Sequence, residues 1–160
     1  MPAATWPAPG AGAVPAHQLT VASARLDPAT GQPSAACELA LVRAVCALLN
    51  SGGGQLQIGV DAGGAPVGID AELASVDPPG RAGYEAWMLG MLTQQLTTQP
   101  ELSVTVEEGE GRPFLVLTVV GADEQVRCRA FREGEPDELW VLLDERPARV
   151  SGAPPRRSPS

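Results

Sequence analysis

The 160-residue sequence contains no lysine, and all 11 of its basic residues are arginines. A P-loop, a Schiff-base lysine and a lysine general base are therefore excluded, because each of these sites needs a lysine side chain. Asp and Glu together number 19, which gives a formal net charge of −8 at pH 7. An acidic chain lacks the broad positive field of most nucleic-acid-binding proteins, but a local group of arginines remains compatible with that charge.

Histidine and cysteine are also scarce, with one histidine and three cysteines. His17 lies in the Ala/Pro/Gly-rich N-terminal stretch, where we expect no catalytic residue. Cys37 and Cys46 fall nine positions apart in one expected helix, and their backbones are thus roughly 13 Å apart. This separation is too large for a disulfide or a shared metal ion. We therefore expect no metal site, no cofactor, and cysteines that act as small buried hydrophobic residues.

The chain has no run of about 18 apolar residues, so no membrane-spanning helix and no membrane partner are expected. Prolines interrupt the N-terminal stretch, and no basic residue precedes an apolar run, which is unlike a secretory signal. We therefore expect a cytoplasmic protein. Residues 1–18 and 152–160 are rich in small residues and proline and are expected to be disordered, which leaves one domain over residues 19–151.

Two helices are expected from local patterns. Ser34 is a suitable N-cap for a helix that ends at Asn50, and apolar residues cover most of its circumference. A second, amphipathic helix is predicted from the apolar stripe of Tyr84, Met88 and Leu92, which recurs at helical spacing.

Alternation of apolar and polar residues, or a short apolar run such as Phe114–Val120, predicts strands in the remaining segments. One strand is expected over residues 55–61, one hairpin over 102–106 and 114–120, and a second hairpin that pairs 127–131 with 139–143. The order of helix, strand, helix and then several strands predicts an α+β fold. We expect two main helices packed on a mixed, mostly antiparallel sheet of about five to six strands.

A glycine-rich segment follows the first helix, but it is not arranged to bind phosphate. A phosphate cradle needs a strand before the loop and a helix after it, so that the helix N-terminus meets the anion. Here the helix comes first, so tight turns around a buried strand are the favoured interpretation, and no nucleotide cofactor is expected. Asp61 at the strand end either forms a turn or binds a divalent metal with another carboxylate, and we favour the turn.

Arginines recur in one late segment. In an extended conformation Arg127 and Arg129 share a face, with Arg132 close by, while Cys128 points to the opposite side and is expected to be buried. This group is either an anion-binding patch or a solvated face balanced by neighbouring glutamates. Trp140 either stacks on a nucleic-acid base or packs in the core or an interface, and packing is the commoner outcome.

Residues 38–69, ELALVRAVCALLNSGGGQLQIGVDAGGAPVGI, resemble the signature of Schlafen AlbA_2 domains. In that family a helix ends in an alanine-and-asparagine phrase, and a Gly-Gly turn, a strand similar to IGVD and a second glycine turn follow. The residues that match in order and spacing are Asn50, Gly53, Gly54, Ile58, Gly59, Val60, Asp61, Gly64, Val67 and Gly68. The resemblance extends over about residues 19–151 and is most specific in its first half.

The resemblance implies a nucleic-acid-binding or regulatory module, because the family is regarded as nucleic-acid associated. The arginines expected to contact DNA or RNA are Arg25, Arg127, Arg129 and Arg132. Some animal members cleave RNA with two glutamates and one aspartate, and Asp61 resembles that aspartate. Residues 19–26 read LTVASARL, without the family's glutamates, so we expect no catalytic activity and regard Asp61 as a remnant. The family's late aromatic-x-Arg phrase is Trp140-Val141-Leu142 here, without the arginine.

Two other functions stay open at this point. The acidic charge, the missing glutamates and the apolar strands Phe114–Val120 and Leu139–Leu143 are also compatible with a protein-interaction module that has lost nucleic-acid binding. Self-association as a homodimer is the commonest form if one of these strands lies at a sheet edge. Metal-dependent RNA cleavage centred on Asp61 is the third alternative.

Overall fold

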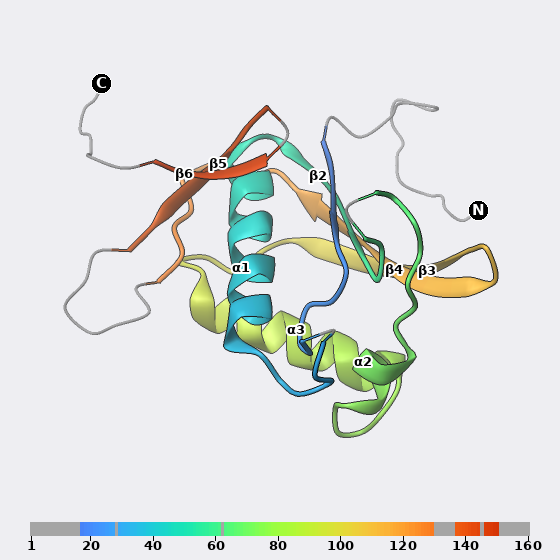
Figure 1. Cartoon of the computed structure of the whole chain (residues 1–160). Helices are drawn as coiled ribbons and strands as arrows, with labels where there is room; N and C mark the ends of the chain where they lie inside the picture. The colour runs from blue at the N-terminus through green and yellow to red at the C-terminus, as the bar shows by residue number, and fades with distance from the viewer. Residues whose placement is uncertain (1–16, 28, 62, 130–136, 145, 151–160) are drawn as a thin grey trace.

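The computed structural model describes residues 17–27, 29–61, 63–129, 137–144 and 146–150 (Figure 1). The elements in these residues are β1 (Gln18–Val21), α1 (Ala35–Asn50), β2 (Gly53–Ile58), α2 (Asp70–Ala74), α3 (Arg81–Gln95), β3 (Leu102–Gly109), β4 (Arg112–Val120), β5 (Leu139–Leu143) and β6 (Arg146–Val150). The predicted α+β class with two long helices is confirmed. Of the terminal segments expected to be disordered, only residues 17 and 18 are described, and β1 begins at Gln18. The other residues of these segments lie outside the described residues.

The strands form two sheets rather than one. The larger sheet has the order β1-β2-β4-β3, with β1 parallel to β2 and the other pairs antiparallel. β5 and β6 form a separate antiparallel pair. The predicted hairpin over 102–120 is confirmed as β3–β4. Phe114–Val120 belongs to β4, which lies between β2 and β3, so it is not the edge strand that self-association would need.

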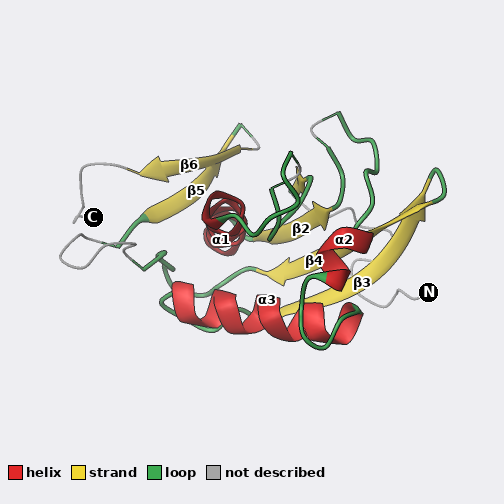
Figure 2. Cartoon of the chain, turned by 60° about the horizontal axis from the view of Figure 1, so that its bottom comes forward, coloured by secondary structure: helices red, strands yellow, loops and turns green. Residues whose placement is uncertain are grey.

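Helix α1 lies between the two sheets. In Figure 2, which looks nearly along α1, the β5–β6 pair lies on one side of the helix and β2 and β4 on the other, while α3 runs beneath β3 and β4. This position explains why α1 is buried over most of its circumference, as predicted, with Leu41, Val45, Cys46 and Leu48 fully buried. Within the described part of the chain, no helix is both long and apolar enough to cross a membrane.

The helix ends follow the local sequence. The Ser34 side chain accepts a hydrogen bond from the Cys37 N–H at 3.3 Å, which confirms the predicted N-cap of α1. In α3 the predicted stripe of Tyr84, Met88 and Leu92 is fully buried against the larger sheet and α1. The cap of α1 and the apolar periodicity of α3 are therefore both visible in a single sequence.

The second predicted hairpin is wrong. Leu139–Leu143 pairs with Arg146–Val150 instead of 127–131, and the earlier segment contributes isolated bridges from Cys128 to Leu96 and Glu138. Residues 130–136 lie outside the described residues. A hairpin that closes across two residues has a smaller loop-closure entropy than one that spans the longer connection. The sequence reading missed β6 because proline normally interrupts a strand, although an outer strand tolerates it.

Candidate nucleic-acid interface

Asn50, the last residue of α1, holds two later segments against the helix. Its Nδ2 group donates to the carbonyl oxygens of Val126 and Trp140, each at 2.8 Å. Its Oδ1 atom accepts from the Val126 N–H, also at 2.8 Å. The asparagine of the motif therefore positions the start of the arginine-containing segment and β5.

The motif glycines allow close approach of neighbouring backbones. A Cβ atom on Gly53 would lie 2.5 Å from the Val119 carbonyl oxygen, and one on Gly54 would lie 2.5 Å from the His17 carbonyl oxygen. Either substitution would push β2 away from the segments beside it. The motif glycines with positive φ are Gly53, Gly59, Gly64 and Gly68.

Asp61 uses its carboxylate in a turn. Its Oδ1 atom accepts hydrogen bonds from the N–H groups of Gly63 and Ala65, each at 2.9 Å. The turn interpretation favoured from the sequence is therefore confirmed. Among the residues that the structure describes, no three His, Cys, Asp or Glu side chains are grouped so that they could hold a metal ion.

Arg127 and Arg129 lie beside the C-terminal end of α3 and are held there by their backbone. The Arg127 N–H donates to the Thr97 side chain, and the Thr97 N–H donates to the Arg127 carbonyl oxygen, both at 3.0 Å. The Arg129 N–H donates to the Gln95 carbonyl oxygen at 2.6 Å. The Arg129 side chain is exposed and that of Arg127 is half-buried. Arg132, the third arginine expected here, lies outside the described residues.

Cys128, between these two arginines, is buried, as predicted, with 2% of its surface exposed. A hydrogen bond with Cys46 and burial raise the pKa of the Cys128 thiol. The thiol therefore stays protonated and does not act as a nucleophile at this site. Its backbone exchanges two hydrogen bonds of 2.8 Å with Glu138, which places Arg127 and Arg129 next to the start of β5.

Arg25 is held at a different place. Its Nε atom donates to the Ser75 hydroxyl at 3.0 Å, its guanidinium lies 5.3 Å from the centre of the Trp87 ring, and Glu38 lies 3.9 Å away. Trp87 is eight residues before Gln95 along α3, a separation of roughly 12 Å along the helix axis. The structure therefore does not bring Arg25 together with the other predicted arginines.

Two arginines that the sequence reading did not select gather at Trp140. Arg43 and Arg149 form ion pairs with Glu138 at 3.3 and 3.7 Å, and the Trp140 indole N–H donates to Glu138 at 2.8 Å. The Arg43 guanidinium lies 4.7 Å from the centre of the Trp140 ring, a cation–π contact. Arg149 is the cross-strand partner of Trp140, so it depends on the β5–β6 pairing, which the sequence reading missed.

Four arginines therefore adjoin the bridge between Cys128 and Glu138: Arg127 and Arg129 flank Cys128 in the sequence, and Arg43 and Arg149 pair with Glu138. We call this group the arginine cluster, and its members are Arg43, Arg127, Arg129 and Arg149. Partial burial raises the pKa of Glu138, but the hydrogen bonds from Trp140 and Arg43 and the nearby guanidinium charges outweigh it and hold the pKa below its usual value. Glu138 is thus ionised at neutral pH and neutralises part of the cluster.

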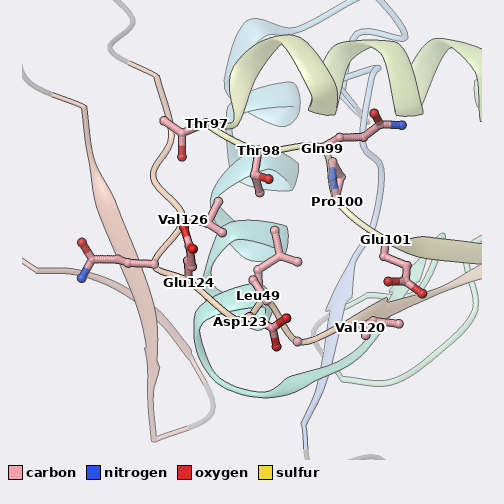
Figure 3. A pocket seen from close by; sticks show the side chains of 13 residues that line it. Leu49, Thr97, Thr98, Gln99, Pro100, Glu101, Val120, Asp123, Glu124 and Val126 are labelled. Atoms are coloured by element: carbon pink, nitrogen blue, oxygen red, sulfur yellow. The ribbon is translucent and has the colours of Figure 1, made fainter.

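A cleft of about 400 Å³ lies near the cluster, between the segment that follows α3 and the segment that follows β4 (Figure 3). Its lining includes the carboxylates of Glu101, Asp123 and Glu124, together with the hydroxyls of Thr97 and Thr98. Like charges repel, so this cleft does not favour a phosphate group. An anionic ligand is expected to contact the arginine cluster outside the cleft.

Comparisons with known proteins identify the fold but no family. No protein-family model matches the sequence, and no curated protein matches it. The DIP2311 protein from Corynebacterium diphtheriae has a TM-score of 0.54 and 17% sequence identity. The chain shares the fold of part of that protein. The match covers 84% of this chain and 21% of the other, so this chain corresponds to a small part of the larger protein.

A second similar structure is the N-terminal domain of a DNA helicase RecG-related protein from Nitrosomonas europaea. It has a TM-score of 0.47 and 17% identity, over 88% of this chain and 81% of that domain. The membership of the Schlafen AlbA_2 family that the motif favours stays a prediction.

Proposed function

We propose that this domain binds DNA or RNA through the arginine cluster and does not cleave it. The observation that carries the proposal is that four arginines flank or pair with the two residues of one backbone bridge, in a chain whose net charge is −8. The resemblance of residues 38–69 to a nucleic-acid-associated family also supports it. Arg25 is left out of the proposed site because its guanidinium is bound by Ser75 and Trp87.

The chemistry of the cluster suits a phosphate backbone. A guanidinium offers several N–H donors in a planar fork, which matches two oxygens of one phosphate. Arg129 is exposed, and Arg127 is fixed at its backbone by Thr97, so little of the backbone has to be ordered when a strand binds. Glu138 competes for Arg43 and Arg149, so we expect weak binding, with a dissociation constant on the order of 10⁻⁴ to 10⁻⁶ M at physiological salt.

Asp61 supports binding without cleavage. A carboxylate that helps to hold a catalytic metal needs oxygen atoms free to coordinate it. The Oδ1 atom of Asp61 already accepts two backbone hydrogen bonds within its own turn. The segment where the family's glutamates are expected contains none, so Asp61 has no carboxylate partner there.

The test is fluorescence anisotropy with labelled single-stranded and double-stranded oligonucleotides at low and moderate salt. The wild-type protein should bind at low salt, and the affinity should fall as salt rises. The double variant Arg127→Ala/Arg129→Ala should bind more weakly, with a salt dependence reduced by about two phosphate contacts. The matched control is Arg112→Ala, which removes an exposed arginine from the distant β3–β4 hairpin. This variant should change neither the affinity for the oligonucleotide nor its salt dependence.

The same samples with Mg²⁺ or Mn²⁺ should leave the oligonucleotides intact on a gel. Absence of binding by the wild-type protein at low salt would contradict the proposed function. Cleavage that disappears in Asp61→Ala would contradict the non-catalytic part and restore the metal-dependent nuclease alternative.

A further inference from the structure

β3 forms a free edge of the larger sheet. It is the last strand in the order β1-β2-β4-β3 and, within the described residues, pairs with β4 alone. Figure 2 shows this strand along the outer margin of the sheet. It has eight residues and therefore offers roughly 27 Å of unpaired backbone. Long, exposed edges are sites where another extended chain can add to a sheet.

The direction of each backbone group along β3 follows from two hydrogen bonds. The Val120 N–H donates to the carbonyl oxygen of Glu101, so the backbone groups of Glu101 face β4. Because these directions alternate along a strand, every second residue from Leu102 to Glu108 directs its N–H and C=O away from β4. The Arg81 guanidinium donates to the outward carbonyl oxygen of Val104 at 3.2 Å, which agrees with this assignment.

The side chains of this edge are exposed and acidic. Val106 is 42% exposed, and the glutamates at and beside the strand are also exposed. These glutamates are Glu101, Glu107, Glu108 and Glu110. Adjacent residues point to opposite faces of a sheet, so Glu107 and Glu108 place a carboxylate on each side of an added strand. A partner with basic side chains is complementary to both faces.

A second copy of this chain is a poorer match for the same edge. Pairing two copies along β3 would bring both sets of glutamates onto one ribbon, and like charges on neighbouring strands are destabilising. A nucleic acid is repelled by the same carboxylates. The charge of the edge therefore selects a cationic extended chain.

We propose that the β3 edge binds a basic, extended peptide segment of another protein by strand addition. The outward backbone groups from Leu102 to Glu108 supply the hydrogen bonds, and the flanking glutamates select lysine or arginine in the partner. Arg81 partly closes the site, because its guanidinium occupies the Val104 carbonyl oxygen that an added strand needs. This surface is distinct from the arginine cluster, so the proposal does not depend on the proposed function.

The test uses a fluorescein-labelled peptide in which arginine or lysine alternates with valine or threonine, and a control peptide with glutamate in place of each basic residue. The basic peptide should bind with an affinity that falls as salt rises, and the acidic peptide should not bind. Amide exchange at Val104, Val106 and Glu108 should slow when the basic peptide is present.

Two variants act on the edge in opposite directions. Val106→Pro removes one outward N–H without touching the β3–β4 hydrogen bonds, so it should weaken binding about tenfold and leave Tm unchanged. Arg81→Ala frees the Val104 carbonyl oxygen and should strengthen binding about fivefold. Thr105→Pro is the matched control: it removes an N–H that faces β4 and should lower Tm. Glu107→Gln/Glu108→Gln should weaken binding and preserve the fold.

The proposal is overturned if the basic peptide fails to bind, if the acidic peptide binds equally well, or if Val106→Pro binds like the wild type. A dimer in sedimentation that Val106→Pro dissociates would also overturn it, since the occupant would then be a second copy. Nucleic-acid binding should be the same in Val106→Pro and the wild type, so failure here and failure of the arginine-cluster proposal can be told apart.

Discussion

Two glutamates connect distant segments at opposite ends of the molecule, and they do so with different kinds of donor. Glu72 in α2 is 4% exposed and accepts hydrogen bonds from neutral groups. These donors are the N–H groups of Ala24, Arg25 and Leu26 and the hydroxyl of Tyr84. Glu138 is only partly buried, accepts hydrogen bonds from the charged side chain of Arg43 and from the indole of Trp140, and forms an ion pair with Arg149.

This difference indicates that the contacts of Glu72 have a structural role, whereas the arginines at Glu138 are accessible to a ligand. The described hydrogen-bond donors to Glu72 are neutral backbone N–H groups and a hydroxyl, so we expect this contact to depend little on salt. Burial and the negative charge of Glu72 raise the pKa of Tyr84, which keeps its hydroxyl protonated as a donor. At Glu138 the charged partners are half exposed, so salt screens them and a phosphate can compete for them.

The largest expected effect comes from Glu72→Ala. It removes the only described acceptor of the Tyr84 hydroxyl and of the N–H groups of residues 24–26, and we expect the free energy of unfolding to fall by about 3 kcal/mol. Urea denaturation at low and high salt measures the loss, which should be equal at both. Tyr84→Phe removes one of these hydrogen bonds and should cost about 1 kcal/mol. A loss for Glu72→Ala below that of Tyr84→Phe would contradict the assigned role.

Asn50→Ala tests how the arginine cluster and the β5–β6 pair are attached to the rest of the fold. It leaves the buried Val126 N–H without its acceptor and releases two carbonyl oxygens, so we expect a loss of about 2 kcal/mol. Amide exchange should accelerate more in β5 and β6 than in β2 and β4. Equal acceleration in both sheets would show that Asn50 supports the whole fold and not the attachment of the smaller sheet.

Local sequence patterns predicted the parts of the fold that local forces determine. The N-cap Ser34, the apolar stripe of α3, the alternation in β3 and the apolar run of β4 are readable because these signals extend over a few residues. β1 was missed because its pairing is parallel and joins Gln18–Val21 to a strand more than thirty residues later. A four-residue strand of this kind has no local signature that separates it from a loop.

The candidate site was harder to predict than the fold. Arg127 and Arg129 stood out because they are two residues apart in the sequence, and Arg25 was grouped with them without a spatial reason. Arg43 and Arg149 join the cluster only through tertiary contacts with Glu138, and a single sequence does not reveal such contacts. Glu72 was overlooked for the same reason, since it lies among other acidic residues and only the folded chain buries it.

Glu138→Gln should have the smallest effect on stability and a direct effect on binding. Glutamine keeps an acceptor for the Trp140 indole but loses the charge that holds Arg43 and Arg149. We expect the free energy of unfolding to fall by about 1 kcal/mol, less at high salt. Affinity for an oligonucleotide should rise by roughly fivefold, because these two arginines become available to phosphate. Unchanged affinity would show that they do not contact the ligand.

The pH dependence of this variant provides an independent check. The pKa of Glu138 in the folded protein lies below its ordinary value of 4.5. The carboxylate therefore stabilises the fold at pH values above the pKa that the same group has in the unfolded chain. This contribution is lost as the pH falls through the folded pKa. The stability difference between the wild type and Glu138→Gln should therefore be constant near neutral pH and shrink below about pH 4.5. A difference that persists in acid would mean that hydrogen-bond geometry, and not charge, attaches Glu138 to its arginines.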